Sequence, residues 1–341
     1  MNRARSQAGG YAIAMLVACS VPAAFAEEAV SFDPRQHPQT QPLVEELTEQ
    51  GVPKEWLEQA LTQASYRQEV LDAMAGAAER RLRWFEYRDI FLTEQRIVEG
   101  AAFMQTHADA LARAEADYGV PPEVITAIIG VETYYGRHKG RHKVLDSLAT
   151  LAFHHPARGD FFRGELAAFL TIAYQQEVEP SSLYGSYAGA MGYPQFIPTS
   201  YQAYAVDFDG DDKRDLWNNP VDAIGSVANY FAEHGWQRGG AIYHEAKGPE
   251  TRPDALRFNQ TVRPDTTAAE AAEQGVVTEA SLSPDTPVIP LVLEYADGQE
   301  RYRLGETNFY VITRYNHSHL YAMAVAELAE AIKQQAEAEH D

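Results

Sequence analysis

The sequence predicts a mainly α-helical fold with a small β-containing region near its C-terminal end. From about residue 32 to 236, apolar residues recur at three- and four-residue spacing, which indicates amphipathic helices. From 237 to 305, glycine, proline, threonine and aspartate become more frequent and strand patterns occur. The helical period then returns in the tail. The chain has 341 residues, enough for more than one domain, and its 45% hydrophobic and 23% charged content is typical of a globular soluble protein.

The N-terminal segment predicts export. Basic residues precede an apolar run that is too short to span a membrane, and small residues before Glu27 suit cleavage. The only cysteine, Cys19, follows Leu-Val-Ala, which resembles a bacterial lipobox. Two processing routes remain open: a signal segment 1–26, or a lipoprotein signal 1–18 with lipidated Cys19 as the mature N-terminus, anchored on a membrane surface. By either route, the mature chain forms no internal disulfide.

The N-terminal part, 27–120, is expected to be helical. The stretch 42–64 has helical spacing interrupted at Gly51-Val52-Pro53, which predicts two short helices. One long amphipathic helix is expected over 93–119. We expect these helices to form one domain that the C-terminal segment 306–341 completes.

The region 121–236 carries further helices around an irregular loop. The pair Pro121-Pro122 suits the first turn of a helix that runs through apolar residues to Glu132. A loop dense in small residues, GSYAGAMGYPQFIPTS, occupies 185–200. The other helices are expected at 144–155, 159–176 and 220–236.

The β-containing region, 237–305, includes the pattern VIPLVLEYADGQERYRL. This pattern predicts a β-hairpin that turns on Asp297-Gly298, a favoured two-residue turn. A short helix is expected at 267–275, before the hairpin. The tail from 318 to 335 has the apolar spacing of a helix.

Charge and histidine spacing exclude some functions. The net charge of -21 argues against non-specific nucleic-acid binding, which needs a basic face. His138 and His142 flank a glycine and have no carboxylate at metal-site spacing, so a zinc site is not predicted. A basic run follows Glu132 and either meets an anionic substrate or is a solvated loop. It consists of Arg137, Lys139, Arg141 and Lys143.

An acidic loop resembles the opening of an EF-hand calcium loop. Aspartates alternate at its first, third and fifth positions, and the seventh residue can offer a backbone carbonyl. The sixth position is aspartate rather than glycine, and the twelfth is Asn218 rather than glutamate, so Asp222 is the expected closing ligand. The expected ligands are Asp207, Asp209, Asp211, Lys213 and Asp222. Such a calcium would be structural; the alternative is a solvated acidic turn that caps a helix.

Glu132 stands at the end of an apolar helix, beside aromatic residues. Desolvation there is expected to raise the pKa of its carboxyl, which suits a general acid; the alternative is a glutamate turned to solvent. The small residues of 185–200 would let an extended substrate approach the backbone, and aromatic rings could stack on sugar faces. Ser186 lacks the G-x-S-x-G nucleophile elbow, so a serine hydrolase is not favoured.

Five stretches, in order, resemble the membrane-bound lytic murein transglycosylase B family: IIGVETYYGR, GSYAGAMGYPQFIPTSY, AVDFDGDDKRDLW, VDAIGSVANYFAEHGW and NFYVITRYNHSHLYAMAV. The resemblance covers about residues 32–335. It implies a lysozyme-like catalytic core over 121–236 with flanking helices, an EF-hand-like calcium loop at 207–222 and a small β-containing domain over 237–305. It also implies cleavage of the MurNAc–GlcNAc β-1,4 bond of peptidoglycan to a 1,6-anhydromuramyl product, with no catalytic cofactor.

Carried over by motif, Glu132 is the single catalytic acid and base. The implied substrate-contacting residues are Ser186, Gln195, Tyr315, Asn316, Tyr321, Tyr87 and Arg158. Two features depart from the family pattern: Pro194 stands where glycine is expected, and the calcium loop is about one residue longer. Glu165 and Asp160 are the nearest candidates for a second carboxylate, and both are expected at the surface or capping a helix.

The resemblance also implies a periplasmic monomer whose partners are the glycan strands of peptidoglycan, with an outer-membrane anchor if Cys19 is lipidated. Two other functions stay open. One is a hydrolytic muramidase on the same fold, which would leave a reducing end. The other is a non-catalytic, calcium-stabilised protein that binds the cell wall.

Overall fold

Helices form most of the chain. The computed structural model describes residues 31–76 and 82–339, so the predicted signal segment and Cys19 lie outside the described residues. The α-helices in these ranges are α1 (Gln41–Glu49), α2 (Lys54–Thr62), α3 (Gln68–Gly76), α4 (Trp84–Phe91), α5 (Glu94–Thr106), α6 (Ala108–Tyr118), α7 (Pro122–Thr133), α8 (Val144–His154), α9 (Gly159–Gln175), α10 (Pro198–Tyr204), α11 (Pro220–Glu233), α12 (Ala268–Glu273), α13 (Thr307–Tyr315) and α14 (His319–Ala338).

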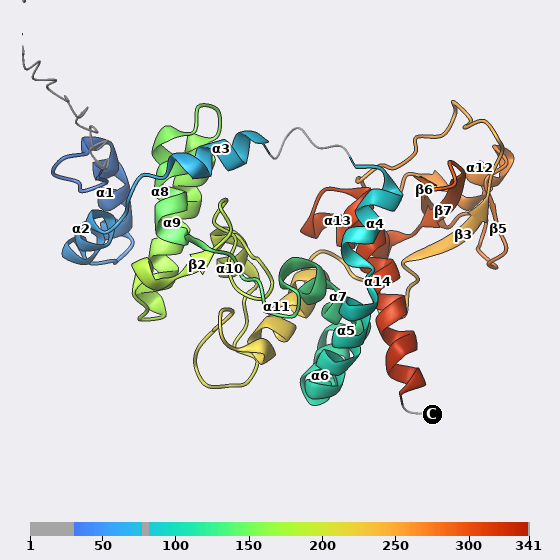
Figure 1. Cartoon of the computed structure of the whole chain (residues 1–341), viewed down its shortest axis with the longest axis horizontal. Helices are drawn as coiled ribbons and strands as arrows, with labels where there is room; N and C mark the ends of the chain where they lie inside the picture. Colours follow the sequence, from blue (N-terminus) through green and yellow to red (C-terminus); the bar gives the residue numbers. More distant parts are fainter. Residues whose placement is uncertain (1–30, 77–81, 340–341) are drawn as a thin grey trace, which may run out of the picture.

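None of these helices is long and apolar enough to cross a membrane. Their arrangement is elongated, with α1, α2, α8 and α9 at one end and a β-sheet at the other (Figure 1). Helices α4, α5, α7 and α14 lie between the sheet and the central α10–α11 region, and the described chain is therefore mainly α, as the sequence predicts.

The N-terminal helices contribute to both parts of the molecule. α1 packs against α9 and α3 against α8, whereas α4 and α5 pack against α14. The segment 306–341 therefore supports the second half of 27–120 but not the first. The described helices of 27–120 therefore fall into two groups that pack against different partners, and the predicted domain bounds stay a prediction.

The long helix predicted over 93–119 is wrong in its middle. α5 ends and α6 begins around His107, whose backbone (φ −113°, ψ 25°) leaves the helical region. The ring of His107 packs on Phe103 at 4.4 Å between centroids. Apolar spacing does not report a single non-helical residue, so the break was invisible in the pattern. The predicted end is confirmed, since Gly119 adopts the left-handed conformation (φ 77°) that suits a helix C-terminus.

The β-containing region forms a five-stranded antiparallel sheet in the order β4-β6-β7-β3-β5. Its strands are β3 (Tyr243–Lys247), β4 (Thr266–Thr267), β5 (Val277–Thr278), β6 (Pro287–Glu294) and β7 (Glu300–Gly305). A separate two-stranded sheet pairs β1 (His142–Lys143) with β2 (Tyr184–Gly185).

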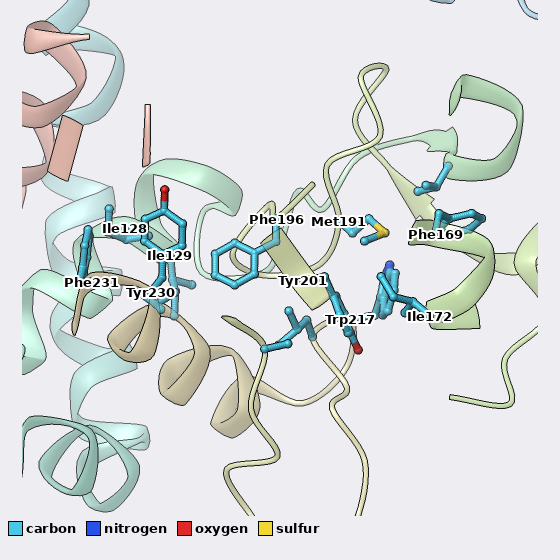
Figure 2. Packing of buried hydrophobic residues seen from close by; sticks show 14 of the residues in the cluster. Ile128, Ile129, Phe169, Ile172, Met191, Phe196, Tyr201, Trp217, Tyr230 and Phe231 are labelled. Atoms are coloured by element: carbon cyan, nitrogen blue, oxygen red, sulfur yellow. The ribbon is translucent and has the colours of Figure 1, made fainter. Parts of the chain in front are cut away.

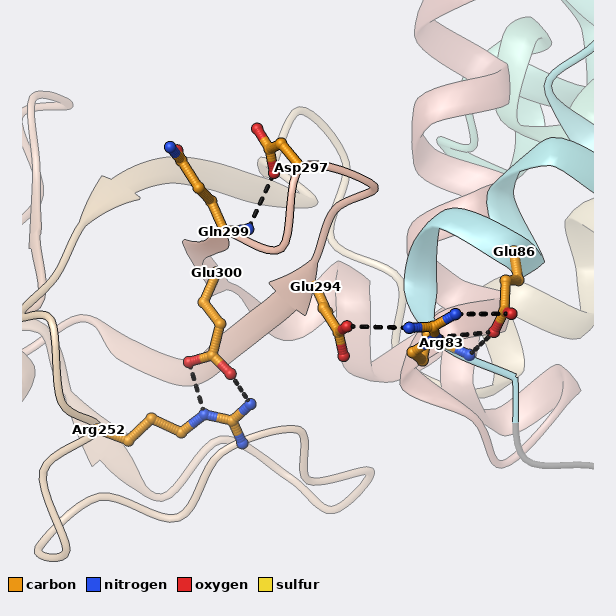
Figure 3. Close-up of polar contacts among 7 residues, drawn as sticks. All are labelled: Arg83, Glu86, Arg252, Glu294, Asp297, Gln299 and Glu300. Carbon is orange, nitrogen blue, oxygen red and sulfur yellow. Dashed lines mark hydrogen bonds and ion pairs between the residues drawn. The ribbon is translucent and has the colours of Figure 1, made fainter.

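The predicted hairpin is confirmed, although its connection is longer than two residues. Strands β6 and β7 pair up to Glu294 and Glu300, and Gly298 takes a positive φ of 75°. In the connection Asp297 accepts a hydrogen bond from the amide of Gln299 (Figure 3). Arg83, just before α4, reaches Glu294 at 3.5 Å and connects the end of β6 to that helix (Figure 3).

Strand β6 is buried on both faces. One face, with Val288 and Val292, belongs to a small core of the sheet region, together with Tyr302 and Leu304 of β7. The other face contributes to the main core of the molecule through Ile289, Leu291 and Leu293. The sheet is therefore attached to the helical part of the molecule by buried apolar contacts as well as by the connecting segments.

The main core runs without interruption through the centre of the molecule. Figure 2 shows Phe196 and Met191, from the irregular loop, between Ile129 of α7 on one side and Phe169 of α9 on the other. All four side chains are at most 3% exposed. Because Phe196 and Met191 are inserted between the two groups of helices, the loop is held against the C-terminal half of α7.

Candidate active site

Glu132 occupies the last turn of α7. The helix follows Pro121, and its residues from Val124 to Gly130 are buried. Glu132 itself is half-buried, and its Oε1 accepts a hydrogen bond of 2.5 Å from the hydroxyl of Tyr321. Burial raises the pKa of Glu132 to about 7, against the opposing effect of that hydrogen bond. Near neutral pH the carboxyl can therefore both give and take a proton.

Three tyrosines from distant segments surround this carboxyl. Tyr321 comes from the first turn of α14 and Tyr315 from the end of α13, with their rings parallel within 11° and 6.4 Å apart. The hydroxyl of Tyr315 donates to the carbonyl of Pro194 at 2.6 Å. Burial, with the nearby charge of Glu132, raises the pKa of Tyr87 in α4 to about 12. All three phenols therefore stay protonated at neutral pH and can donate hydrogen bonds.

The chain turns sharply after Glu132. Tyr134, Tyr135 and Gly136 all take positive φ values, of 53°, 59° and 85°. Such strain in non-glycine residues needs compensation and concentrates at functional sites. The buried hydroxyl of Thr133 supplies part of it by donating to the carbonyl of Tyr193 and accepting from the amide of Gly136, both at 3.0 Å. The turn thus fixes the direction of Glu132.

Gly136 is needed at this turn for space as well as for its φ. A Cβ there would lie 1.9 Å from the ring of Tyr193. The ring of Tyr134 contacts two guanidinium groups, Arg96 at 4.6 Å and Arg137 at 4.8 Å from its centre. These cation–π contacts help to hold the end of α7.

The loop 185–196 is shaped by its own polar groups. The hydroxyl of Ser186 accepts from the amides of Ala188 and Ala190, at 3.2 and 3.0 Å. Gln195, at φ 51°, donates from its side-chain amide to the carbonyls of Gly192 and Lys139, at 2.9 and 3.3 Å. Both residues therefore stabilise the loop that Thr133, next to Glu132, contacts through Tyr193.

The small residues of this loop have a use that the sequence did not reveal. A Cβ on Gly192 would approach the carbonyl oxygen of Leu216 to 2.2 Å, and one on Gly185 would approach that of Ala190 to 2.2 Å. The glycines at these two positions accommodate close approach of protein backbone. The approach of a substrate to this loop stays a prediction.

The two remaining predicted contacts differ in position. Asn316 follows Tyr315 directly and is exposed. Arg158 is exposed at the start of α9, where its guanidinium lies over the rings of Phe161 and Phe162 at 4.5 and 5.1 Å. Within the described residues, no hydrogen bond or ion pair joins Arg158 to Glu132 or to the tyrosines around it.

Neither candidate for a second carboxylate contacts Glu132 in the described part of the chain. The side chain of Asp160 is 96% exposed and pairs with Arg163. Glu165 is buried, and its two oxygens accept from the amide and the hydroxyl of Thr199 at 3.0 and 2.8 Å. Glu165 therefore caps α10, and the sequence-based expectation of surface and capping positions agrees with these contacts.

The acidic loop brings three carboxylates together. Asp207, Asp209 and Asp211 each offer an oxygen within 4.8 Å of the others. The amide of Lys213 donates to Asp211 at 2.9 Å. Asp212 adopts φ 68° at the sixth position, where an EF-hand needs glycine for a sharp turn. A set of hard oxygen donors on such a turn fits calcium.

Asp222 is fully buried at the start of α11, where its two oxygens accept from the amides of Phe208 and Asp215, both at 2.8 Å. These bonds connect two parts of the acidic loop to the helix. The group of three converging carboxylates does not include Asp222, and its expected role as a closing ligand stays a prediction. Asn219, which the sequence analysis did not select, caps α11 and donates to Asp209 at 2.8 Å.

The Transglycosylase SLT domain family matches residues 35–330 of this chain. The chain belongs to this family. It is 40% identical over 307 residues to the membrane-bound lytic murein transglycosylase B of Escherichia coli K12, which covers 87% of this chain and 83% of that protein. These matches confirm the family resemblance that the sequence motifs indicate.

Two solved structures of the family have the same fold. The soluble lytic transglycosylase SltB1 from Pseudomonas aeruginosa is 46% identical, with a TM-score of 0.82 over 89% of this chain and all of that one. The Escherichia coli lytic transglycosylase Slt35 in complex with calcium is 40% identical, with a TM-score of 0.82 over 90% of this chain and 96% of that one.

In this SLT domain, three residues near Glu132 escaped the sequence analysis. Thr133 is the buried hinge of the turn, and its position directly after Glu132 was the available clue. Tyr193 receives the Thr133 hydrogen bond, and the ammonium of Lys139 lies 4.4 Å from its ring centre. Pro194, seen only as a departure from the family pattern, supplies the carbonyl that holds Tyr315.

The raised pKa of Glu132 predicts a pH-dependent stability difference. A carboxyl whose pKa is about 7 when folded and 4.5 when unfolded favours folding below pH 4.5, and that contribution is lost as pH rises to about 7. Glu132→Gln is therefore expected to be more stable than the wild type at pH 8, with a free energy of unfolding higher by up to about 3 kcal/mol and a higher unfolding temperature. The advantage should shrink at pH 5. Thermal unfolding of both proteins at the two pH values tests this, and an equal difference at both would contradict the raised pKa.

Proposed function

We propose that this protein cleaves the β-1,4 bond between MurNAc and GlcNAc in peptidoglycan glycan strands and leaves a 1,6-anhydromuramyl end without consuming water. The carrying observation is Glu132, one carboxyl with a pKa near 7 amid protonated tyrosines. Membership of the SLT family supports the same enzyme class.

In the proposed reaction Glu132 acts first as an acid and then as a base. Its proton goes to the glycosidic oxygen as that bond breaks, and the acetamido group at C2 can stabilise the positive centre that develops at C1. The ionised carboxylate then takes the proton of the sugar's own 6-hydroxyl, whose oxygen attacks C1. Because the attack is intramolecular, it gains from proximity.

The residues around Glu132 have separate roles in positioning the carboxyl and in shaping the loop. Tyr321 holds the carboxyl through its hydrogen bond, and Tyr315 connects the same cluster to the loop at Pro194. Ser186 and Gln195 set the shape of that loop, against which the glycan would lie. Asn316 offers an exposed side-chain amide next to Tyr315, whereas Arg158 would meet only a substrate that extends to the start of α9.

A hydrolytic muramidase on the same fold is the weaker alternative. An inverting glycosidase uses a second carboxylate to activate water, at about 6.5–9.5 Å from the first. Asp160 is on the surface and Glu165 is committed to Thr199, so neither is arranged for this role. A non-catalytic role would leave the strained turn and the raised pKa of Glu132 without a use.

We also place the mature protein in the periplasm as a monomer, on the strength of its N-terminal segment and its proposed substrate. Of the relatives, one is named membrane-bound and another soluble, so both forms are compatible with the family. The measured mass of the mature N-terminus distinguishes a lipidated Cys19 from cleavage before Glu27.

Replacing the acid tests the function directly. Glu132→Gln removes the transferable proton at nearly constant volume and is expected to reduce cleavage of purified peptidoglycan by at least about a thousandfold. Mass spectrometry of the wild-type digest should show anhydro ends. A hydrated reducing end would favour the muramidase, and activity retained in the variant would remove Glu132 from the mechanism.

The single-carboxyl mechanism makes a separate prediction for Glu165. Glu165→Gln keeps one acceptor for Thr199 but sets its amide against a donor, so we expect a loss of about 1–2 kcal/mol of stability. Cleavage at 25 °C should remain near the wild-type rate. A folded variant without activity would mean that a second carboxylate takes part.

We propose that Asp207, Asp209 and Asp211, with the carbonyl of Lys213, hold a structural calcium ion, as the calcium complex of Slt35 suggests for a relative. Asp212→Gly relieves a left-handed non-glycine residue, worth about 1 kcal/mol. The relief applies to the folded loop whether or not an ion is bound, so thermal unfolding should show the variant to be more stable than the wild type by up to that amount. Chelation should lower the melting temperature of the wild type, and a melting curve insensitive to calcium would count against the site.

A further inference from the structure

The structure divides the basic run that follows Glu132 into two pairs. Arg137 forms an ion pair with Glu99 at 2.7 Å, and the ammonium of Lys139 donates to the carbonyl of Trp217 at 2.6 Å. These two cations are therefore used in holding the fold. Arg141 and Lys143 form no ion pair and no side-chain hydrogen bond within residues 31–76 and 82–339.

Arg141 and Lys143 line one small polar pocket together with Arg67. The pocket has a volume of about 190 Å³ and lies where α3, strand β1, strand β2 and the start of α8 meet. The chain carries a net charge of -21, so three cations around one cavity are a local exception to its charge. The volume suits one small charged group.

Two further features of the pocket favour an anion. Ser147 lines it, is fully buried, and its hydroxyl has no hydrogen-bond partner in the described part of the chain. Helix α8 begins here, and the residue at its N-cap, Lys143, provides no side-chain cap. The amide of Val144 donates to the carbonyl of Leu183 at 3.0 Å, and the amides that follow it in the first turn carry the partial positive charge that favours an anion.

The acidic residues of the pocket do not cancel this charge. Asp146 accepts from the amide of Ser65 and pairs with Arg67 at 2.9 Å, so its charge is neutralised inside the wall. Glu69 is the other acid, exposed on the first turn of α3. Arg141 and Lys143 together outweigh Glu69, and Glu69 remains able to accept from an ammonium group beside the anion.

The pocket is connected to the proposed glycan-binding loop through the backbone. Lys143 pairs with Tyr184 and His142 with Gly185 in the β1–β2 sheet, and Ser186 follows at once. The side chain of Tyr184 is 47% exposed at this pocket. A group attached to a glycan on the loop would therefore approach the pocket along β2.

We propose that this pocket binds a carboxylate of the stem peptide that peptidoglycan strands carry. This inference rests on the proposed function, because the glycan would deliver the peptide. Arg141, Lys143 and the Ser147 hydroxyl would donate to the carboxylate, and Glu69 would accept from an amino group of the same peptide. Charge-assisted hydrogen bonds of this kind are the strong ones.

The test uses a pocket variant that carries Arg141→Gln and Lys143→Gln together, and compares it with a matched control variant. The control combines Lys247→Gln and Arg257→Gln, which remove the same charge at exposed positions of the β-sheet region. Each protein is assayed on glycan strands with stem peptides and on the same strands after an amidase has removed them. The pocket variant should raise KM about tenfold on the peptide-bearing strands, with kcat unchanged.

On strands without stem peptides, the pocket variant should have the KM and kcat of the wild type. The control variant should have the wild-type values on both substrates. An equal effect of the pocket variant on both substrates, or no effect on either, would overturn the proposal.

A binding experiment separates this proposal from the proposed function. Free stem peptide, the same peptide with amidated carboxyl groups, and inorganic phosphate are titrated calorimetrically into the wild type and the pocket variant. Only the unmodified peptide should bind the wild type, and the variant should lose that binding, even if no strand is cleaved. Binding of the amidated peptide with equal affinity would overturn the carboxylate assignment. Binding of inorganic phosphate as tightly as the peptide would also overturn the carboxylate assignment.

Discussion

The hydrogen bond between Tyr321 and Glu132 joins the C-terminal helix α14 to α7 at the point where the chemistry is proposed. A carboxyl at the end of an apolar helix is stable only if it keeps its proton or finds a partner, and here it has both a raised pKa and a phenol at 2.5 Å. That phenol comes from a helix 189 residues away in sequence. The position of α14 against α4, α5 and α7 is therefore a condition for the site. The sheet region adds to it, because β6 packs on α4 and β7 on α13.

The turn after Glu132 shows how the fold compensates for local strain. Two tyrosines in left-handed conformations are unfavourable on their own, by roughly 1–2 kcal/mol each. The compensation comes from side-chain contacts of the turn, most of them with other segments: the hydroxyl of Thr133 donates to the carbonyl of Tyr193, the phenol of Tyr135 donates to the carbonyl of Arg96, and the guanidinium groups of Arg96 and Arg137 lie over Tyr134. The direction of Glu132 is thus set by contacts that exist only in the folded protein.

Local features were predictable from the sequence because their causes are local. The helix break at Gly51, the proline start of α7 and the left-handed end at Gly119 follow from backbone preferences of single residues. The single acid was found because an apolar run gave it no ordinary reason to be there. Contacts between residues that are distant in the sequence could not be predicted from local patterns. The hydrogen bonds from the amides of Phe208 and Asp215 to Asp222 were not predicted, because these groups come within reach only after folding.

The acidic loop is connected to the candidate active site through a series of hydrogen bonds and packing contacts. Asp222 accepts from the amide of Asp215, near the end of the loop. The next two residues contact the active-site loop and the turn region: the carbonyl of Leu216 accepts from the amide of Tyr193, and the carbonyl of Trp217 accepts from the ammonium of Lys139. Gly192 packs against the same carbonyl of Leu216 with no room for a side chain. Tyr193 in turn receives the hydroxyl of Thr133, next to Glu132. An ion that orders the acidic loop would therefore stiffen the wall on which the catalytic turn rests, while remaining outside the chemistry.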